Sequence, residues 1–298
     1  MAPVTLLVLA WASTFAAIKV GLDYCPPLLF AGLRSLLGGA AMALVACRSG
    51  LPARLRAAWS TYLALAVLNV VLFFGLQTLS LQYLPTGMAA VLIYLQPVLV
   101  GLLAWPLLGE HLGVAKVSGL LLGFAGVVTV SASSLRADVP AQGVVLALLS
   151  ALAWALGTIF LKRRQHSVAY PWAVTGQFLA GGLVLTALGL VAEEPGAIVW
   201  APQLWVALGY AGLVGSALAW ALWFWLVRAG EASRAAAYIF FVPLTAIVIG
   251  AVVLDEPVTL LTAVGAVLVV AGIYLTNRRP ARRTYREPRH TTQGGTRP

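Results

Sequence analysis

Charged residues are scarce in this chain of 298 residues. Asp, Glu, Lys and Arg together make up 9% of the sequence, whereas hydrophobic residues make up 61%. Soluble domains carry about 25% charged residues, because a surface that faces water has to be covered with polar groups. The composition therefore excludes a soluble globular protein and favours a protein embedded in a lipid bilayer.

Acidic side chains are missing from the middle of every long hydrophobic run. Glu110, Asp255 and Glu256 fall in short predicted turns instead. We expect Glu110 and Glu256 to cap the helices that follow them, because free N–H groups at a helix start attract carboxylates. A transporter that exchanges lipophilic cations for protons normally needs a carboxylate inside the membrane. This absence argues against such a mechanism.

Metal-binding and catalytic motifs are absent from the sequence too. The two cysteines, Cys25 and Cys47, lie at opposite ends of one hydrophobic run, and the three histidines fall in predicted loops or the tail. There is no carboxylate pair with metal-binding spacing, no H-E-x-x-H motif and no nucleophile beside a base. We expect no metal and no cofactor, and a membrane-embedded enzyme is only a remote alternative.

Ten hydrophobic runs are long enough to cross the hydrocarbon core, which takes about 20 helical residues. They span residues 3–22, 28–47, 61–81, 87–108, 113–131, 142–161, 170–191, 204–226, 235–254 and 258–276. The connectors between them are too short to hold a soluble domain. The sequence predicts an all-α membrane protein with ten transmembrane helices.

Basic residues are distributed unevenly over the predicted connectors. If the N-terminus is cytoplasmic, the inner connectors and the tail hold nearly all of them, and the outer ones hold only Arg136. The positive-inside rule then places both termini in the cytoplasm and the protein in the cytoplasmic membrane. We attribute the net charge of +10 to this asymmetry and to a basic, disordered tail at 278–298, and expect the lipid bilayer, not nucleic acid, as partner.

The chain nearly repeats itself. Residues 88–131 align without a gap with residues 234–277, so that Pro97, Glu110 and Gly119 correspond to Pro243, Glu256 and Gly265. This repeat predicts two five-helix halves, residues 1–135 and 136–277. Because each half has an odd number of spans, the two halves run antiparallel in the membrane. Inverted repeats of this kind are typical of transporters, whose substrate site lies between the halves.

Two prolines stand at matching positions within hydrophobic runs. Pro97 and Pro243 each remove a backbone hydrogen bond, which frees the carbonyl groups of Ile93 and Ile239 and kinks the helix. A matched pair of interrupted helices is a pointer to a transporter site. We therefore predict that both prolines act as hinges.

Two basic residues lie within hydrophobic runs. Lys19 is late in the first run and Arg34 is early in the second, which places both at similar predicted depth. A charged side chain at bilayer depth costs about 2.5–3.5 kcal/mol even on a permissive scale, so it needs a reason. Together they favour a positive site for a carboxylate or another anion, although snorkelling of Lys19 and a structural role for Arg34 remain alternatives.

Further polar and aromatic residues at membrane depth are candidates for lining a substrate cavity. The alternative for each is a structural role that joins neighbouring helices. These candidates are Trp11, Asn69, Gln77, Tyr94, Gln96, Trp154, Trp220, Tyr238 and Phe241.

Several stretches together resemble the EamA-type members of the drug/metabolite transporter superfamily. They are WASTFAAIKVG at the start, LRSLL around Arg34, LQYLPTGMAAVLIYLQPVLVGLLAWPLLGEHL in the first half and ASRAAAYIFFVPLTAIVIGAVVLDEP in the second. The resemblance covers about residues 6–277. It implies a ten-helix inverted repeat with a central cavity formed by the first four helices of each half. The fifth helices would lie at the periphery.

Members of that family move small metabolites, and amino-acid exporters are prominent among them. We therefore predict a secondary transporter, acting as an exporter of amino acids or related carboxylates by alternating access. An exporter of neutral or toxic hydrophobic compounds is the alternative, and it predicts that Lys19 and Arg34 are dispensable. The sequence leaves the coupling ion and the oligomeric state open.

Overall fold

The structure is a computed structural model that describes residues 2–48, 50, 55–84, 86–130, 140–245 and 260–277. All regular elements in these ranges are helical, which confirms the all-α prediction. The first half holds α1 (Ala2–Leu22), α2 (Pro27–Arg48), α3 (Leu55–Leu65), η1 (Ala66–Leu72), α4 (Phe73–Ser80), α5 (Thr86–Ile93), α6 (Gln96–Leu108) and α7 (Val114–Val130). The second holds α8 (Ala141–Arg164), α9 (Tyr170–Ala192), η3 (Pro195–Ala197), α10 (Pro202–Tyr210), η4 (Ala211–Leu218), α11 (Ala219–Ala229), α12 (Ala232–Ala237), η5 (Tyr238–Phe240) and α14 (Leu260–Asn277).

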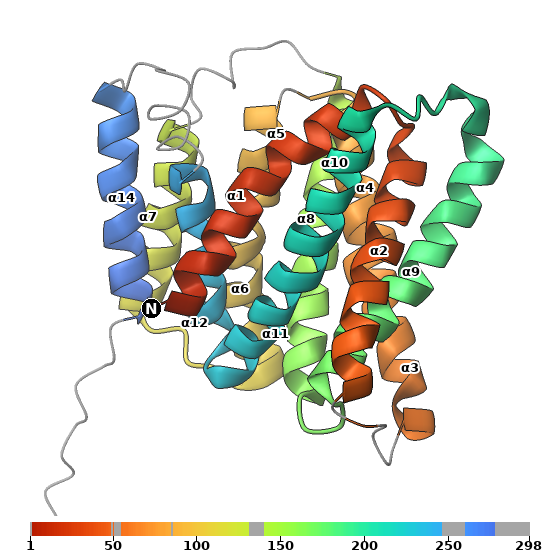
Figure 1. Cartoon of the computed structure of the whole chain (residues 1–298). Coiled ribbons are helices and arrows are strands. Elements are labelled where there is room, and N and C mark those ends of the chain that lie inside the picture. The colour runs from red at the N-terminus through yellow and green to blue at the C-terminus, as the bar shows by residue number, and fades with distance from the viewer. Residues whose placement is uncertain are drawn as a thin grey trace, which may run out of the picture.

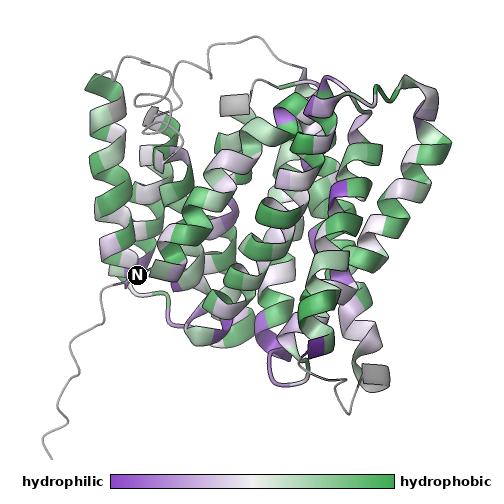
Figure 2. Ribbon diagram, viewed as in Figure 1, coloured by the Kyte–Doolittle hydropathy of each residue, from purple (hydrophilic) through white to green (hydrophobic). Residues whose placement is uncertain are grey.

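Seven helical stretches of the described residues are long and apolar enough to cross a membrane. They are Ala2–Leu22, Pro27–Arg48, Ala58–Ser80, Met88–Leu108, Ala141–Arg164, Tyr170–Ala192 and Pro202–Ala229. Two shorter apolar helices, Val114–Thr129 and Ala263–Asn277, lie where the fifth and tenth spans were predicted. The ninth predicted span leaves the described ranges after residue 245, and the tail at 278–298 lies outside them. Hydrophobic residues predominate along the helices, as expected for a protein that lipid surrounds (Figure 2).

Helix α7 packs against α14 at one side of the bundle, and α2 packs against α9 at the other (Figure 1). The α7–α14 contact is close because glycines meet at it. A Cβ on Gly119 would lie 2.7 Å from the carbonyl oxygen of Gly272, and one on Gly126 would lie 2.7 Å from that of Gly265. Gly265 and Gly272 are 146 positions after Gly119 and Gly126, the shift of the sequence repeat. Gly119 thus contacts the counterpart of Gly126, and Gly126 contacts the counterpart of Gly119. A twofold axis produces this pattern.

The α2–α9 contact has the same reciprocal pattern. A Cβ on Gly39 would lie 2.9 Å from the backbone nitrogen of Leu179, and one on Gly182 would lie 3.0 Å from that of Leu36. Gly182 and Leu179 follow Gly39 and Leu36 by 143 positions. The contacts run antiparallel, so the internal twofold axis is perpendicular to the helices. Small residues permit this close approach of backbones in the membrane.

Two π-helical segments interrupt the third span and its counterpart. The last residues of η1 and η4, Leu72 and Leu218, are 146 positions apart, so the two interruptions are equivalent in the repeat. The sequence analysis did not predict them, because no proline or other simple signal marks a π-helical turn. Such turns are frequent at functional sites, where they change the direction of the side chains that follow.

The fourth and ninth spans are also interrupted, next to the two prolines. In the fourth, α5 ends at Ile93 and α6 begins at Gln96, with Pro97 in its first turn. In the ninth, α12 passes into the 3₁₀ segment η5, which ends three residues before Pro243. A proline accounts for both, because it cannot donate the hydrogen bond that would continue the preceding turn.

Candidate functional site

A small cavity lies at the centre of the bundle. Its volume is about 30 Å³, and a cavity needs about 10–15 Å³ to hold one water molecule. The residues that line it come from α1, α2, α4, α5, the turn between α5 and α6, α8, η4 and α11. They are Trp11, Thr14, Phe15, Ile18, Arg34, Phe73, Phe74, Gln77, Ile93, Tyr94, Trp154, Gly215 and Trp220. In this conformation the cavity is too small for a metabolite, so a substrate can bind only if the lining side chains move apart.

Arg34 supplies the charge in this cavity. Its side chain is only 2% exposed, and no carboxylate of the described residues lies within ion-pairing distance of it. The guanidinium lies 3.9 Å from the ring centroid of Phe74, and it donates a long hydrogen bond of 3.5 Å to Gln77 Oε1. Its Nε has no partner. A buried cation without an anion is costly, and the arrangement therefore suits an anionic ligand.

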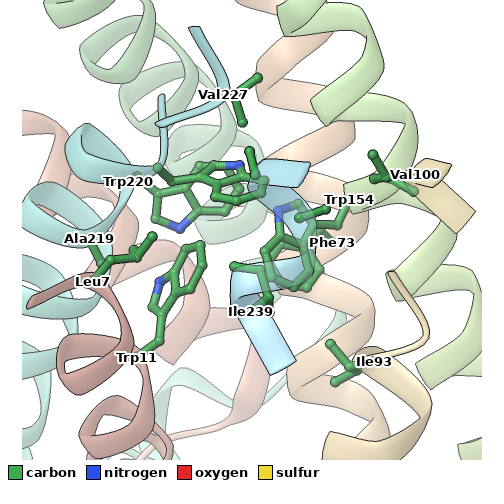
Figure 3. Packing of buried hydrophobic residues seen from close by; sticks show 14 of the residues in the cluster. Leu7, Trp11, Phe73, Ile93, Val100, Trp154, Ala219, Trp220, Val227 and Ile239 are labelled. Carbon is green, nitrogen blue, oxygen red and sulfur yellow. The ribbon is translucent and has the colours of Figure 1, made fainter. Parts of the chain in front are cut away.

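Aromatic rings make up much of the cavity lining. Figure 3 shows Trp11, Phe73, Trp154 and Trp220 packed together. Trp11 and Trp154 meet edge to face with centroids 5.3 Å apart, and Phe73 stacks on Trp154 at 4.8 Å. Trp220 lies against Phe74 at 5.7 Å. Trp154 follows Trp11 by 143 positions and Trp220 follows Phe74 by 146, so both pairs consist of repeat counterparts. The internal twofold axis therefore passes through this aromatic cluster.

Lys19 does not line the cavity, contrary to the expectation that it would share a positive site with Arg34. Its side chain is exposed, whereas Ile18 beside it is buried and lines the cavity. Each step of four residues turns a helix by about 40° beyond one full turn, so Lys19 lies about 80° round from Trp11. Ile18, seven residues from Trp11, lies within about 20° of it. The face of α1 that carries Trp11 and Ile18 therefore lines the cavity, and Lys19 lies outside that face.

Two of the candidate amides join helices instead of lining the cavity. Asn69 in η1 donates to Gln177 Oε1 of α9 at 2.9 Å, and Gln96 donates to Thr158 Oγ1 of α8 at 3.3 Å. Both amides are buried. Hydrogen bonds between helices of this kind contribute to association in the membrane, so the structure favours the structural alternative for Asn69 and Gln96.

Some of the remaining candidates line the cavity and others do not. Trp11, Gln77, Tyr94, Trp154 and Trp220 line the cavity together with Arg34. Tyr238 and Phe241 are partly buried and pack against the hydrophobic core outside it. Neither proline lines it either, although Pro97 follows the interruption beside Tyr94 and Pro243 follows the one at η5.

Phe74, the aromatic partner of Arg34, was not among the residues predicted from the sequence. Phe73 and Phe74 line the cavity, as do Thr14, Phe15 and Ile18 of α1. A signal was present, because the repeat continues without a gap upstream of residue 88 and aligns Phe74 with Trp220. Extending that alignment into the third and eighth spans would have identified Phe74 as a candidate.

Glu110 caps a helix of the other half, not the helix that follows it. Its Oε1 accepts a hydrogen bond of 2.6 Å from the backbone N–H of Ala232, and its Oε2 accepts from the N–H and the hydroxyl group of Ser233. These donors begin α12, whereas α7 was the expected partner. The correction follows from the fold, which brings the α6–α7 turn to the start of α12. The other predicted cap, Glu256, lies outside the described residues.

An ionic cluster surrounds this cap and joins the two halves. Lys116 Nζ lies 2.7 Å from Glu231 Oε2 and 3.5 Å from Glu110 Oε2, and Arg234 Nε lies 2.9 Å from Glu231 Oε2. Burial tends to raise the pKa of Glu231, but the hydrogen bond and charge of Lys116 and the charge of Arg234 outweigh burial and lower that pKa below its ordinary value. Together with the cap, the cluster ties the α6–α7 turn to the start of α12.

Nothing in the described ranges offers a metal site, since no three His, Cys, Asp or Glu side chains gather there. The cavity instead combines one buried cation, a few hydrogen-bond donors and aromatic walls. Such a site binds and orients a ligand by charge and by apolar contact, and it lacks groups arranged for acid–base chemistry.

The sequence model of the EamA-like transporter family matches residues 4–132 and again residues 141–278. The chain belongs to this family. This EamA transporter is 42% identical over 271 residues to the uncharacterized transporter YvbV of Bacillus subtilis (strain 168), an alignment that covers 91% of this chain and 89% of that one. It is 29% identical, over 91% of this chain and 92% of the relative, to a probable amino-acid metabolite efflux pump of Salmonella typhimurium.

A solved crystal structure shows the same fold. Its chain superposes on this EamA transporter with a TM-score of 0.79, at 21% sequence identity, over 92% of this chain and 95% of the other. The two matches of the family model fall on either side of residues 133–140. The protein is therefore a multi-pass membrane transporter, and its family argues against an enzyme.

Proposed function

We propose that this protein exports small carboxylate-bearing metabolites, amino acids or related acids, across the cytoplasmic membrane. The observation that carries the proposal is Arg34, a buried cation with no acidic partner in the described part of the structure, on the wall of the central cavity. An arginine is the side chain best suited to a carboxylate, because its planar fork can donate two parallel hydrogen bonds. Export is supported by the relatives named as amino-acid metabolite efflux pumps in Salmonella typhimurium and Escherichia coli.

Transport proceeds by alternating access between two inverted halves, residues 1–135 and 136–277. Support comes from the reciprocal glycine contacts, from the cavity on the axis between the halves, and from the matched interruptions at η1 and η4 and beside Pro97 and Pro243. Interrupted helices at equivalent positions let each half bend around a central site. The ion pair of Lys116 and Glu231 joins the α6–α7 turn to the start of α12, and separation of these two segments during transport would break it.

Ten spans with both termini in the cytoplasm complete the proposal. The excess of Lys and Arg on the predicted inner side supports this orientation, including the basic tail at 278–298. The cavity then lies in the outer half of the membrane, and the cluster around Glu110 lies at its cytoplasmic face.

Counterflow into proteoliposomes tests the substrate class. Liposomes loaded with an unlabelled amino acid or carboxylate should take up the labelled solute, and Arg34→Gln should abolish uptake. Arg48→Gln is the matched control, because Arg48 is exposed at the far end of the same helix. Lys19→Gln should leave uptake largely intact, since Lys19 does not line the cavity. Uptake of carboxylates that survives Arg34→Gln would refute the proposal.

The aromatic walls favour one second candidate, an exporter of neutral or toxic hydrophobic compounds. Trp11, Trp154 and Trp220 provide the apolar surface that such compounds need. This candidate predicts counterflow of uncharged aromatic solutes that is unaffected by Arg34→Gln, so the same experiment separates the two.

A further inference from the structure

The described lining of the central cavity carries a positive charge that no negative charge balances. Among the described residues that line it, Arg34 is the only charged one, and none of them is Asp or Glu. A ligand with one negative charge and no positive charge would neutralise this site. A zwitterion would bring its own ammonium group into the cavity beside the guanidinium, where like charges repel strongly because water is largely excluded.

The hydrogen-bonding groups of the cavity that lack a partner also favour an anionic ligand. The buried polar atoms of lining residues that have no partner are Arg34 Nε, Trp154 Nε1 and Trp220 Nε1. All three are donors. The acceptor Gln77 Oε1 already receives the hydrogen bond of Arg34, and Thr14 Oγ1 donates to the carbonyl oxygen of Ala10 at 2.6 Å. The cavity thus offers free donors for the oxygens of an acid, and none of the unpartnered buried side-chain atoms of its described lining is an acceptor for an ammonium group.

An ammonium group could in principle rest on an aromatic face, but several faces in this cluster already contact Arg34 or another ring. The guanidinium of Arg34 lies 3.9 Å from the ring centroid of Phe74. Phe73 and Trp154 stack on each other, and the edge of one of the rings of the Trp11–Trp154 pair covers the face of the other. A cation gains from a ring only when it lies over an open face.

We infer that the substrate is a monocarboxylate with an apolar body and no ammonium group, such as a 2-oxo acid, and that the corresponding amino acid binds more weakly. This inference rests on the proposed function, because it requires a carboxylate at Arg34. The donors Trp154 Nε1 and Trp220 Nε1 are available for an additional oxygen such as that of the oxo group. The aromatic walls take the hydrocarbon part.

Matched ligands test the inference on the full-length protein. We would titrate purified protein with 4-methyl-2-oxopentanoate, leucine and 4-methylpentanamide, and follow the quenching of tryptophan fluorescence, since three tryptophans line the cavity. The oxo acid and leucine share a carbon skeleton and a carboxylate, and differ at the carbon that carries the ammonium group. The amide lacks the negative charge. Proteoliposome counterflow of the labelled oxo acid and labelled leucine gives a second readout.

We expect the oxo acid to bind at least about tenfold more tightly than leucine, which corresponds to about 1.4 kcal/mol, and to be exchanged faster. Arg34→Gln should remove this binding, Arg34→Lys should retain the ranking at weaker affinity, and Arg48→Gln should match the wild type. The inference would be overturned if leucine bound as tightly as the oxo acid or more tightly and Arg34→Gln removed that binding. The proposed function would then still stand. Binding of the amide as tight as the oxo acid, or no binding of any of the three by the wild type, would count against both.

Discussion

Trp11 and Trp154 occupy equivalent positions in the two halves, and their indole rings meet at right angles with centroids 5.3 Å apart. Two counterparts can touch only where the internal twofold axis passes between them. This axis also passes the contact of Phe74 with Trp220. The aromatic cluster is therefore both the junction of the halves and the wall of the cavity, so a movement of one half against the other has to change the cavity.

Trp154→Ala should destabilise the protein by about 3–5 kcal/mol, as is typical for the loss of a buried tryptophan, and should abolish transport. The reason is that Trp154 contacts rings of α1, α4 and α11 at once. Trp105→Ala is the control, because Trp105 is 62% exposed on the surface of α6. Denaturant-induced unfolding of both variants in the same detergent measures the difference. Equal stabilities would contradict the structure of the cluster.

Gly119→Ala should separate α7 from α14. The added Cβ would lie 2.5 Å from the backbone nitrogen of Thr276 and 2.7 Å from the carbonyl oxygen of Gly272, and neither backbone atom can move away cheaply. Gly209→Ala is the matched control, since a Cβ there meets nothing within 4 Å and alanine favours the helix by about 1 kcal/mol over glycine. Thermal unfolding should therefore shift down for the first variant and stay level or rise for the second.

The ion pairs of Glu231 should make the stability of the folded protein depend on pH in the acidic range. Because its pKa is lower in the folded protein than the ordinary value of 4.5, its contribution is complete above that value and is lost as the pH falls through the folded pKa. We expect the melting temperature of the wild type to fall more than that of Glu231→Gln when the pH is lowered from 7 towards 3.5. Parallel pH profiles would show that the Lys116–Glu231 contact contributes nothing.

The two cysteines should differ sharply in reactivity. Burial, together with the nearby charge of Glu193, raises the pKa of the Cys25 thiol to about 12, so almost none is thiolate at neutral pH. Cys47 is exposed at the end of α2. A maleimide should label Cys47 readily and Cys25 hardly at all, which mass spectrometry of the Cys25→Ser and Cys47→Ser variants can measure.

The same labelling tests the proposed orientation. An impermeant maleimide should modify Cys47 only after intact cells are permeabilised, because the positive-inside rule places that end of α2 in the cytoplasm. Labelling of Cys47 in intact cells at the permeabilised rate would reverse the orientation. The intrinsic reactivity of the exposed Cys47 thiol does not depend on which side of the membrane it faces. The reactivity test and the orientation test are therefore independent.

Composition and periodicity alone determined the all-helical membrane class and the approximate position of most helices, and the repeat predicted two related halves. These features depend on local properties: an apolar run of about 20 residues has to satisfy its own backbone hydrogen bonds in lipid, and a helix is the way a single segment does so. The repeat is visible in residues 88–131 because glycines, a proline and an acidic turn there recur 146 positions later.

Tertiary structure alone decided which of the candidates share the cavity. Arg34 and Lys19 looked equivalent in the sequence, yet small rotations about the axis of α1 place Lys19 outside the cavity, and only the packing of α1 against its neighbours sets that rotation. Glu110 likewise binds a helix that begins 122 residues later. Partners so distant along the chain are chosen by how whole helices pack, and no local pattern of residues encodes that choice.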